Sequence, residues 1–204
     1  SITADPCYNI SAILVDGEAD TNFVAGVPTA EYTMSNIDSN HTVVAQFETT
    51  TYEVTVNVTG NGTADPTSGT YNCGDTVVFT FTPDNDGVEV ESVVVNGNNI
   101  GSVTSYVING ISADYTIDVT FADITYTLTS VAYNNGTIDP LGDTTVAYNG
   151  SITYTLTPDA CQTVSELLVN GVSYLDSASF DGTTLTLDNI QRDMTIQAYF
   201  QVMT

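Results

Sequence analysis

One segment type recurs three times along the chain, and this repetition limits most strongly how the chain can fold. The shared pattern is an isoleucine, a threonine five residues later, and a phenylalanine five residues after that. It occurs over residues 37–47, 111–121 and 190–200. The spacing gives a repeating unit of about 75 residues. Such repetition predicts stacked or beaded modules rather than one fold around an active site, and therefore an architectural or binding role.

The first copy of the unit contains only its second half. Residues 1–7 have the pattern of residues 155–161, which lie in the middle of the third copy. We therefore predict an incomplete repeat module over residues 1–49 and complete modules over 50–123 and 124–204. Because residue 1 lies inside a repeat and no signal peptide pattern is present, we expect a processed form. The alternative is a natural protein that extends upstream.

Strand patterns are dense along the chain, and helix patterns are nearly absent. Residues 52–58 and 115–121 alternate apolar with polar side chains, with many β-branched and aromatic residues, as half-buried strands require. Asx-Gly pairs, typical of tight hairpins, follow an apolar run at residues 16–17, 96–97 and 170–171. The sequence predicts an all-β fold of tandem, small, sandwich-like modules. Each complete module is expected to begin with a hairpin, at about 52–82 and 126–157, followed by a three- or four-stranded second half.

The charge of the chain excludes two classes of partner. There are 25 acidic residues and a net charge of −24, and Arg192 is the only lysine or arginine. Nucleic acid is excluded because no cationic surface can displace counterions from phosphate. Attraction to an anionic membrane is excluded for the same reason, and no apolar run is long enough for membrane insertion. We predict an extracellular or cell-surface location.

The motifs shared by the copies resemble a known family. They are Thr-Pro-Asp, then Leu/Val-Val-Asn/Asp-Gly, then Asn-Ile, and finally Thr-Ile/Val followed by Phe. This pattern resembles the divergent InlB B-type bacterial repeats, and the resemblance extends over essentially the whole chain. It implies tandem extracellular β-modules of a secreted or surface protein, such as a stalk, an adhesin or a fibre component. It implies no catalytic residue.

The three cysteines are unevenly distributed among the copies. Some repeats of this type carry two cysteines on neighbouring strands, in Tyr-Asn-Cys-Gly and in Asp-x-Cys. Here Cys73 occupies the first position, and Cys7 and Cys161 occupy the second. A Cys7–Cys73 disulfide would follow if the hairpin of the second copy completed the first by a swap. A bridge between copies or subunits, a free thiol and reduced, buried cysteines are the alternatives.

The incomplete module predicts an assembly site. Half a sandwich leaves an unpaired strand edge and an exposed apolar face, and a strand from another chain can satisfy both. The predicted open-core face consists of Ile10, Ile13, Val43, Ala45 and Phe47. Copies joined head to tail at this face would form a fibre, because the contact does not close. We therefore predict a structural subunit of an extracellular filament or cell-surface fibre. The alternative is a stalk or binding segment of an adhesin that engages a glycan or a surface protein.

No other residue pattern predicts chemistry. His41 is the only histidine, and alignment of the copies places it with Tyr115 and Met194 at a structural position. No nucleophile motif accompanies it, so we do not expect an enzyme. The acidic turn 84–87 departs from the spacing of an EF-hand. We expect no cofactor and no dedicated metal site, although weakly bound divalent cations between modules would be compatible with the charge.

Overall fold

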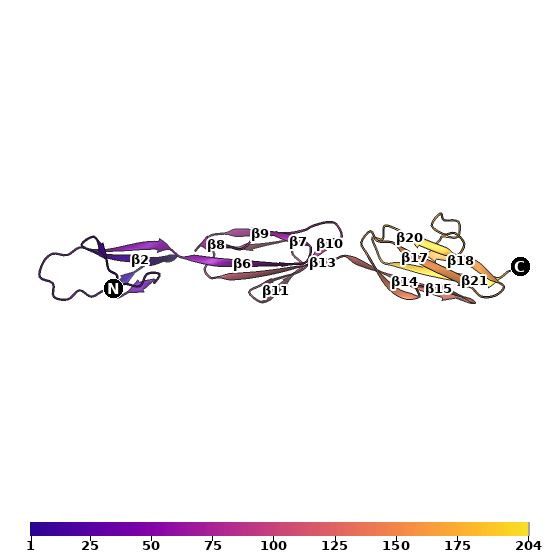
Figure 1. Ribbon diagram of the computed structural model, residues 1–204, viewed down its shortest axis with the longest axis horizontal. Helices are drawn as coiled ribbons and strands as arrows, with labels where there is room; N and C mark the ends of the chain where they lie inside the picture. The colour runs from indigo at the N-terminus through magenta and orange to yellow at the C-terminus, as the bar shows by residue number, and fades with distance from the viewer. Residues whose placement is uncertain (204) are drawn as a thin grey trace. The chain divides into compact units, whose positions relative to one another are not determined.

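The computed structural model describes residues 1–203 and contains only β-strands, turns and loops (Figure 1). About 60% of the chain is in strands, which confirms the all-β prediction. The strands are β1 (Ile2–Thr3), β2 (Tyr8–Val15), β3 (Glu18–Ala19), β4 (Thr29–Ala30), β5 (Val43–Thr49), β6 (Thr51–Thr59), β7 (Gly62–Asp65), β8 (Gly69–Asn72), β9 (Val77–Pro83), β10 (Val88–Val95), β11 (Asn98–Gly101), β12 (Ser105–Ile108), β13 (Tyr115–Asp123), β14 (Thr125–Tyr133), β15 (Gly136–Asp139), β16 (Gly142–Ala147), β17 (Ile152–Pro158), β18 (Gln162–Val169), β19 (Val172–Ser173), β20 (Thr184–Leu187) and β21 (Met194–Val202). Among residues 1–203 there is no helix that could span a membrane.

The chain divides into two compact units. The first contains Ser1–Asp84 and Val90–Phe121, and the second contains Asn85–Glu89 and Ala122–Thr204. The first unit therefore holds the incomplete module together with most of the second module. The second unit holds the third module and the turn at Asn85–Glu89.

Each complete module is a sandwich of two sheets. In the second module the strand order is β11-β10-β13-β6-β8 in one sheet and β12-β9-β7 in the other. The third module repeats this arrangement, with β16-β14-β21-β18-β19 facing β15-β17-β20. The alternation seen in the sequence places every second side chain of β13 in the core, where Ile117, Val119 and Phe121 are buried. The tandem repeat is therefore a repeat of the whole strand topology.

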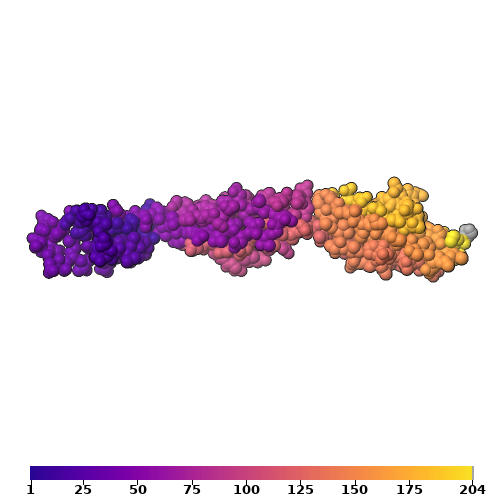
Figure 2. Space-filling view, viewed as in Figure 1, coloured from indigo at the N-terminus to yellow at the C-terminus, as the bar shows by residue number. Residues whose placement is uncertain are grey.

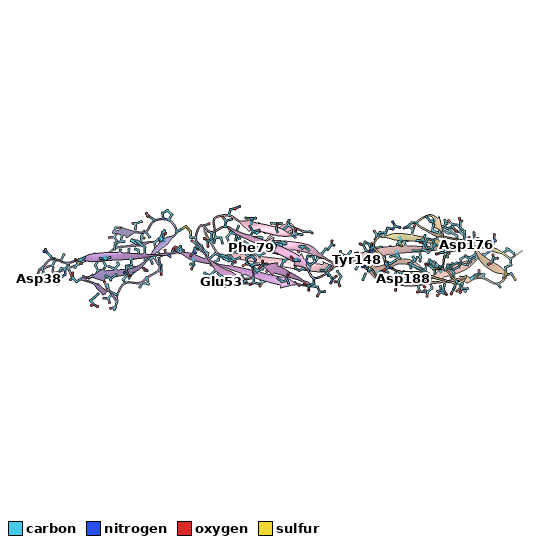
Figure 3. All side chains as sticks on the ribbon, turned by 90° about the horizontal axis from the view of Figure 1, so that it is seen from above. Asp38, Glu53, Phe79, Tyr148, Asp176 and Asp188 are labelled. Atoms are coloured by element: carbon cyan, nitrogen blue, oxygen red, sulfur yellow. A yellow bond between two sulfur atoms is a disulfide. The ribbon has the colours of Figure 1, made fainter. Side chains whose placement is uncertain are left out.

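The core of the third module illustrates how the repeated residues pack. Figure 2 shows the outer surface of this module, in orange and yellow, beneath which the core lies. Its buried cluster consists of Leu128, Ile138, Tyr154, Leu156, Leu167, Val169, Leu185, Leu187, Ile190, Ile196, Ala198 and Phe200. In the second module Phe79, labelled in Figure 3, occupies the place of Tyr154 and is also fully buried. The hydrophobic effect, through burial of these apolar side chains, holds the two sheets of each module together.

The prediction that each complete module opens with a hairpin is wrong, because the first two strands do not pair with each other. β6 pairs in parallel with β13, the last strand of its module, with Tyr115 opposite Val54 and Val119 opposite Val58. On its other side β6 pairs with β8, whereas β7 pairs with β9 in the second sheet. The turn at Gly60–Asn61 therefore carries the chain from one sheet to the other instead of joining two paired strands. β14 and β21 form the same parallel pair in the third module.

The Asx-Gly turns do form hairpins, as the sequence predicts. They join β2 to β3, β10 to β11 and β18 to β19, and each pair is antiparallel. Both residues of each turn have positive φ, as a type I′ turn requires. The values are 53° and 89° at Asp16-Gly17, 48° and 81° at Asn96-Gly97, and 49° and 77° at Asn170-Gly171.

The incomplete module retains one part of each sheet. The sheet β3-β2-β5 corresponds to β11-β10-β13, and the two-stranded sheet β1-β4 corresponds to a fragment of the second sheet. The register between β2 and β5 is that of the third module, including a bulge between Ile10 and Ala12 that matches the bulge between Val164 and Glu166. The module contains no counterpart of β6, so β5 is the edge of its sheet.

Candidate assembly site

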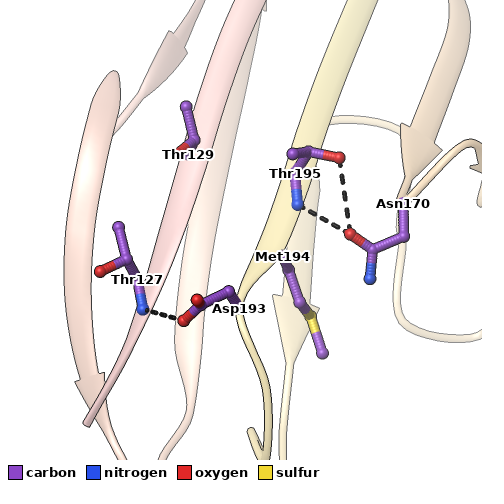
Figure 4. A pocket seen from close by; sticks show the side chains of 6 residues that line it. All are labelled: Thr127, Thr129, Asn170, Asp193, Met194 and Thr195. Carbon is purple, nitrogen blue, oxygen red and sulfur yellow. Dashed lines mark hydrogen bonds between the residues drawn. The ribbon is translucent and has the colours of Figure 1, made fainter.

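In all three modules a side chain from the hairpin turn holds the start of the last strand. An Asp or Asn oxygen accepts a hydrogen bond from a threonine backbone N–H, as such residues commonly do in turns. Figure 4 shows this contact in the third module. The pairs are Asp16 with Thr42, Asn96 with Thr116, and Asn170 with Thr195, each at 2.8 Å. The last strand therefore begins at a fixed place in every copy.

In the first module His41, just before the last strand, also contacts this turn. Its Nδ1 lies 2.7 Å from Asp16 Oδ2, and its Nε2 lies 3.3 Å from Ser39 Oγ. Hydrogen bonds to the carboxylate, first from the Thr42 backbone and then from His41, lower the pKa of Asp16. The histidine therefore links Ser39 to the turn residue Asp16.

In each complete module an aspartate holds the first strand beside the last one. Asp114 Oδ1 accepts a hydrogen bond from Glu53 N in β6, and Asp193 Oδ1 accepts one from Thr127 N in β14, both at 2.8 Å (Figure 4). The corresponding residue of the first module is Asn40, whose side-chain oxygen could accept the same bond. The acceptor position therefore exists in the first module, which has no first strand of its own.

The closing phenylalanine behaves differently in complete and incomplete modules. Phe121 and Phe200 are 4% and 2% exposed, whereas Phe47 is 46% exposed. The same contrast holds four residues earlier, where Val43 is 42% exposed and its counterpart Ile117 is fully buried. In the complete modules the phenylalanine ring packs against Gly62 of β7 or Gly136 of β15, strands that the first module lacks. Phe47 instead faces a hollow of about 430 Å³ that Thr3, Asp5 and Tyr8 also line.

The five residues predicted to form the open-core face lie together on one side of the β2–β5 pair. Ile10 is opposite Phe47, and Ile13 is opposite Ala45. The structure differs from the expectation of a fully open face, because Ile10 and Ile13 are buried and Ala45 is half-buried. The segment after β3 folds back beside β2. Its contacts are Asp20 N to Ile13 O, Ile10 N to Val27 O, and Gly26 N to Ile10 O. The open part is therefore centred on Val43, Phe47 and the free edge of β5.

Cys7 and Cys73 form a disulfide in the first compact unit, drawn in yellow in Figure 3, with their Cα atoms 5.2 Å apart. The swap that was expected to favour this bond is absent, because β6, β7 and β8 all pair within their own module. The bond instead crosses the point where β5 continues into β6. There Cys7 O accepts from Thr50 N, and Thr50 O accepts from Cys73 N, both at 2.8 Å. Cys161 is a free, exposed cysteine.

The acidic turn forms a local hydrogen bond of its own. Asn85 Oδ1 accepts from Gly87 N at 2.8 Å, and Val88 N donates to Asn85 O. Within residues 1–203, no group of three or more His, Cys, Asp or Glu side chains is arranged to hold a metal ion.

Comparison with known proteins places one of these modules in a family. A family model of the divergent InlB B-repeat domain matches residues 52–124. The second module is a divergent InlB B-repeat domain. These limits correspond to β6 through β13, the strands that build the second sandwich. No curated protein and no solved structure matches the chain.

The match confirms the resemblance seen in the sequence for this module. Divergent InlB B-repeat domains occur in extracellular and surface proteins. The second module of this chain is a domain of this kind. The third module has the same strand order, the same parallel pair and the same turn contacts as the second.

The sequence patterns did not identify Asp114 and Asp193 as site residues. Their role depends on a parallel strand pairing that local patterns do not reveal.

Proposed function

We propose that this chain is a structural subunit of an extracellular filament or cell-surface fibre, assembled by strand complementation of its open half-module. The observation that carries the proposal is the exposure of Phe47 and Val43 beside the free edge of β5. Their counterparts in the second module, Phe121 and Ile117, are buried once a parallel first strand is in place. An unpaired strand edge next to an apolar face is a common docking site for an added strand.

The complete modules specify the strand that the site would take. It runs parallel to β5, as β6 runs parallel to β13, and it inserts an apolar side chain where Val54 and Leu128 are fully buried. Its first residues would donate a backbone hydrogen bond to Asn40, as Glu53 donates to Asp114. Main-chain pairing supplies affinity, and the alternate apolar side chains supply specificity.

A second copy of this chain is the occupant that we propose. The chain itself encodes two strands of the required pattern, β6 and β14, each followed by the elements that cover the core. A copy that gives such a strand to its neighbour leaves one of its own modules open. That module then takes a strand from the next copy, so the exchange propagates instead of closing. Since each copy has a net charge of −24, assembly should require screening salt or cations.

The test is electron microscopy and light scattering of the purified chain at physiological salt. Fibres with a regular axial repeat are expected from the unmodified chain, and none from Phe47→Asp, because a carboxylate cannot enter the completed core. The matched control is Val44→Asp on the opposite face of β5. Val44 has the same exposure as Phe47, and its counterpart in the second module is already an aspartate, Asp118. This control should still assemble.

Two results would overturn the proposal. The first is that the unmodified chain forms only separate particles at every salt concentration. That result would favour the alternative function, a stalk segment of a surface protein. The second is fibres from Phe47→Asp that match those of the unmodified chain, which would mean that assembly uses another surface.

A further inference from the structure

One backbone arrangement recurs where each module follows the one before it. In the first compact unit, Cys7 O accepts a hydrogen bond from Thr50 N, and Thr50 O accepts one from Cys73 N, both at 2.8 Å. These two bonds place the turn that carries Cys73 against the turn that carries Cys7, and the disulfide links the two turns covalently.

The same arrangement occurs in the second compact unit without cysteines. Gly87 O accepts from Ile124 N at 2.8 Å, and Ile124 O accepts from Tyr148 N at 2.9 Å. Gly87 corresponds to Cys7, and Tyr148, labelled in Figure 3, corresponds to Cys73. A Cβ added at Gly87 would lie 3.7 Å from Tyr148 Cβ, so the two turns are in contact here too. The backbone arrangement is therefore general, and the disulfide is one way of closing it.

Cys161 occupies this position in the third module. Its carbonyl accepts a hydrogen bond from Met203 N at 2.9 Å, and Met203 corresponds to Thr50. Its φ is 64°, against 69° for Cys7, so the two cysteines share one backbone conformation. Within residues 1–203, however, no turn lies against Cys161 as Cys73 does against Cys7. The Cys161 thiol is free and exposed, and Met203 beside it is 59% exposed.

We infer that Cys161 forms a disulfide with a further repeat module, through a cysteine at the position that Cys73 holds in the second module. A lone exposed cysteine would not support this inference. The equivalent residue of the same molecule, however, forms this bond, with the same backbone hydrogen bond behind it. The occupant is a turn of the type Tyr-Asn-Cys-Gly, whose cysteine N–H donates to Met203 O. This inference does not depend on the proposed filament.

Formation of the bond requires an oxidant, and we take this to be a small-molecule disulfide such as oxidised glutathione. The Cys161 thiolate attacks one sulfur of that disulfide, forms a mixed disulfide and releases one small thiolate. The incoming cysteine thiolate then attacks Cys161 Sγ and displaces the second small thiolate. Two protein thiols are thereby oxidised, the small disulfide is reduced to two thiols, and the protons of the protein thiols pass to the leaving groups.

The experiment extends the full chain with a second copy of residues 52–123 after Thr204. This junction needs no designed linker, because Thr204 corresponds to Thr51 in the repeat. The extended chain is oxidised with a glutathione redox buffer, treated with a thiol-alkylating reagent and mapped by mass spectrometry without reduction. We expect a peptide in which Cys161 is linked to the cysteine of the added module, and loss of alkylation at Cys161.

The matched control replaces the added cysteine with tyrosine, the residue at Tyr148, and should leave Cys161 either alkylated or bonded to glutathione, with no link to another cysteine of the protein. The Cys7–Cys73 bond in the same molecule reports that the chain is folded and the buffer oxidising. If that bond forms while Cys161 and the added cysteine are each found alkylated or bonded to glutathione, and not to each other, the inference is wrong. Bonding of the added cysteine to any residue other than Cys161 overturns it as well.

Discussion

The ring of Phe200 lies directly against Gly136. A Cβ at position 136 would be 2.7 Å from three of the ring carbons, which is closer than real side chains approach. The second module has the same relationship, with a Cβ at Gly62 placed 2.5 Å from the Phe121 ring. Neither glycine has a positive φ, so the requirement for glycine is one of space. The glycine that begins β7 or β15 therefore makes room for the phenylalanine near the end of the same module.

Replacement of this glycine should destabilise the third module. We expect Gly136→Ala to lower its unfolding free energy by about 1–3 kcal/mol, because the added methyl group overpacks a filled core. Chemical denaturation followed by circular dichroism measures the change. The control is Phe200→Leu, alone and combined with Gly136→Ala. If steric conflict with the ring is the cause, the alanine should cost less in the leucine background; an equal cost would contradict this explanation.

The buried hydroxyl of Tyr154 contributes little to the stability of the third module. The side chain is fully buried, and its hydroxyl has no hydrogen-bond partner among the described residues. Its counterpart in the second module is Phe79, which is buried in the same place without the hydroxyl. We expect Tyr154→Phe to stabilise the third module by about 1 kcal/mol, since an unsatisfied polar group leaves the core. A loss of stability in thermal or chemical unfolding would indicate that the hydroxyl is satisfied.

Tyr154 also predicts a response to alkaline pH. Burial raises the pKa of Tyr154 to about 12, above its ordinary value of 10.0. The folded state therefore keeps the proton after the unfolded state has begun to lose it. The resulting contribution to stability is complete below pH 10 and is lost as the pH rises through about 12. Over this range the unmodified chain should lose more stability than Tyr154→Phe, and equal losses would show that this tyrosine does not respond as predicted.

Asp16 should make the first module sensitive to acid. Hydrogen bonds from the Thr42 backbone and from His41 lower its pKa below the ordinary value of 3.8. Because the folded pKa is the lower one, the contribution to stability is present above pH 3.8 and is lost as the pH falls through the folded value. Amide exchange at Thr42 measures this directly, with Thr116 and Thr195, held by asparagines, as internal references.

Two substitutions separate the charge of Asp16 from its geometry. Asp16→Asn should keep the amide of Thr42 protected and remove the sensitivity to acid, since Asn96 and Asn170 make this contact in the other modules. Asp16→Ala should lose the protection at every pH. Continued acid sensitivity in the asparagine variant would assign the effect to another carboxylate.

Local patterns predicted the parts of the fold that depend on neighbouring residues. The type I′ turns follow from Asn-Gly and Asp-Gly, and the buried faces follow from alternation along β13. The parallel pairing of β6 with β13 could not be predicted in this way, because it joins strands about 60 residues apart and leaves no local signature. The burial of Ile10 and Ile13 was missed because the covering segment, residues 20–30, is largely irregular. Cys7–Cys73 was among the predicted pairings, but for a different reason, since the bond crosses a junction rather than completing a swap.

The contact between Gly87 and Tyr148 can be converted into a disulfide if the turns behave as the Cys7–Cys73 pair does. A Cβ at Gly87 would lie 3.7 Å from Tyr148 Cβ, within the roughly 3.5–4.5 Å typical of disulfides. We expect the double variant Gly87→Cys, Tyr148→Cys to form this bond under mild oxidation, as measured by peptide mapping without reduction. Each single variant is the control and should leave its new thiol open to alkylation, as Cys161 is in the unmodified chain. Free thiols at both 87 and 148 in a folded double variant would show that the two turns do not hold this separation.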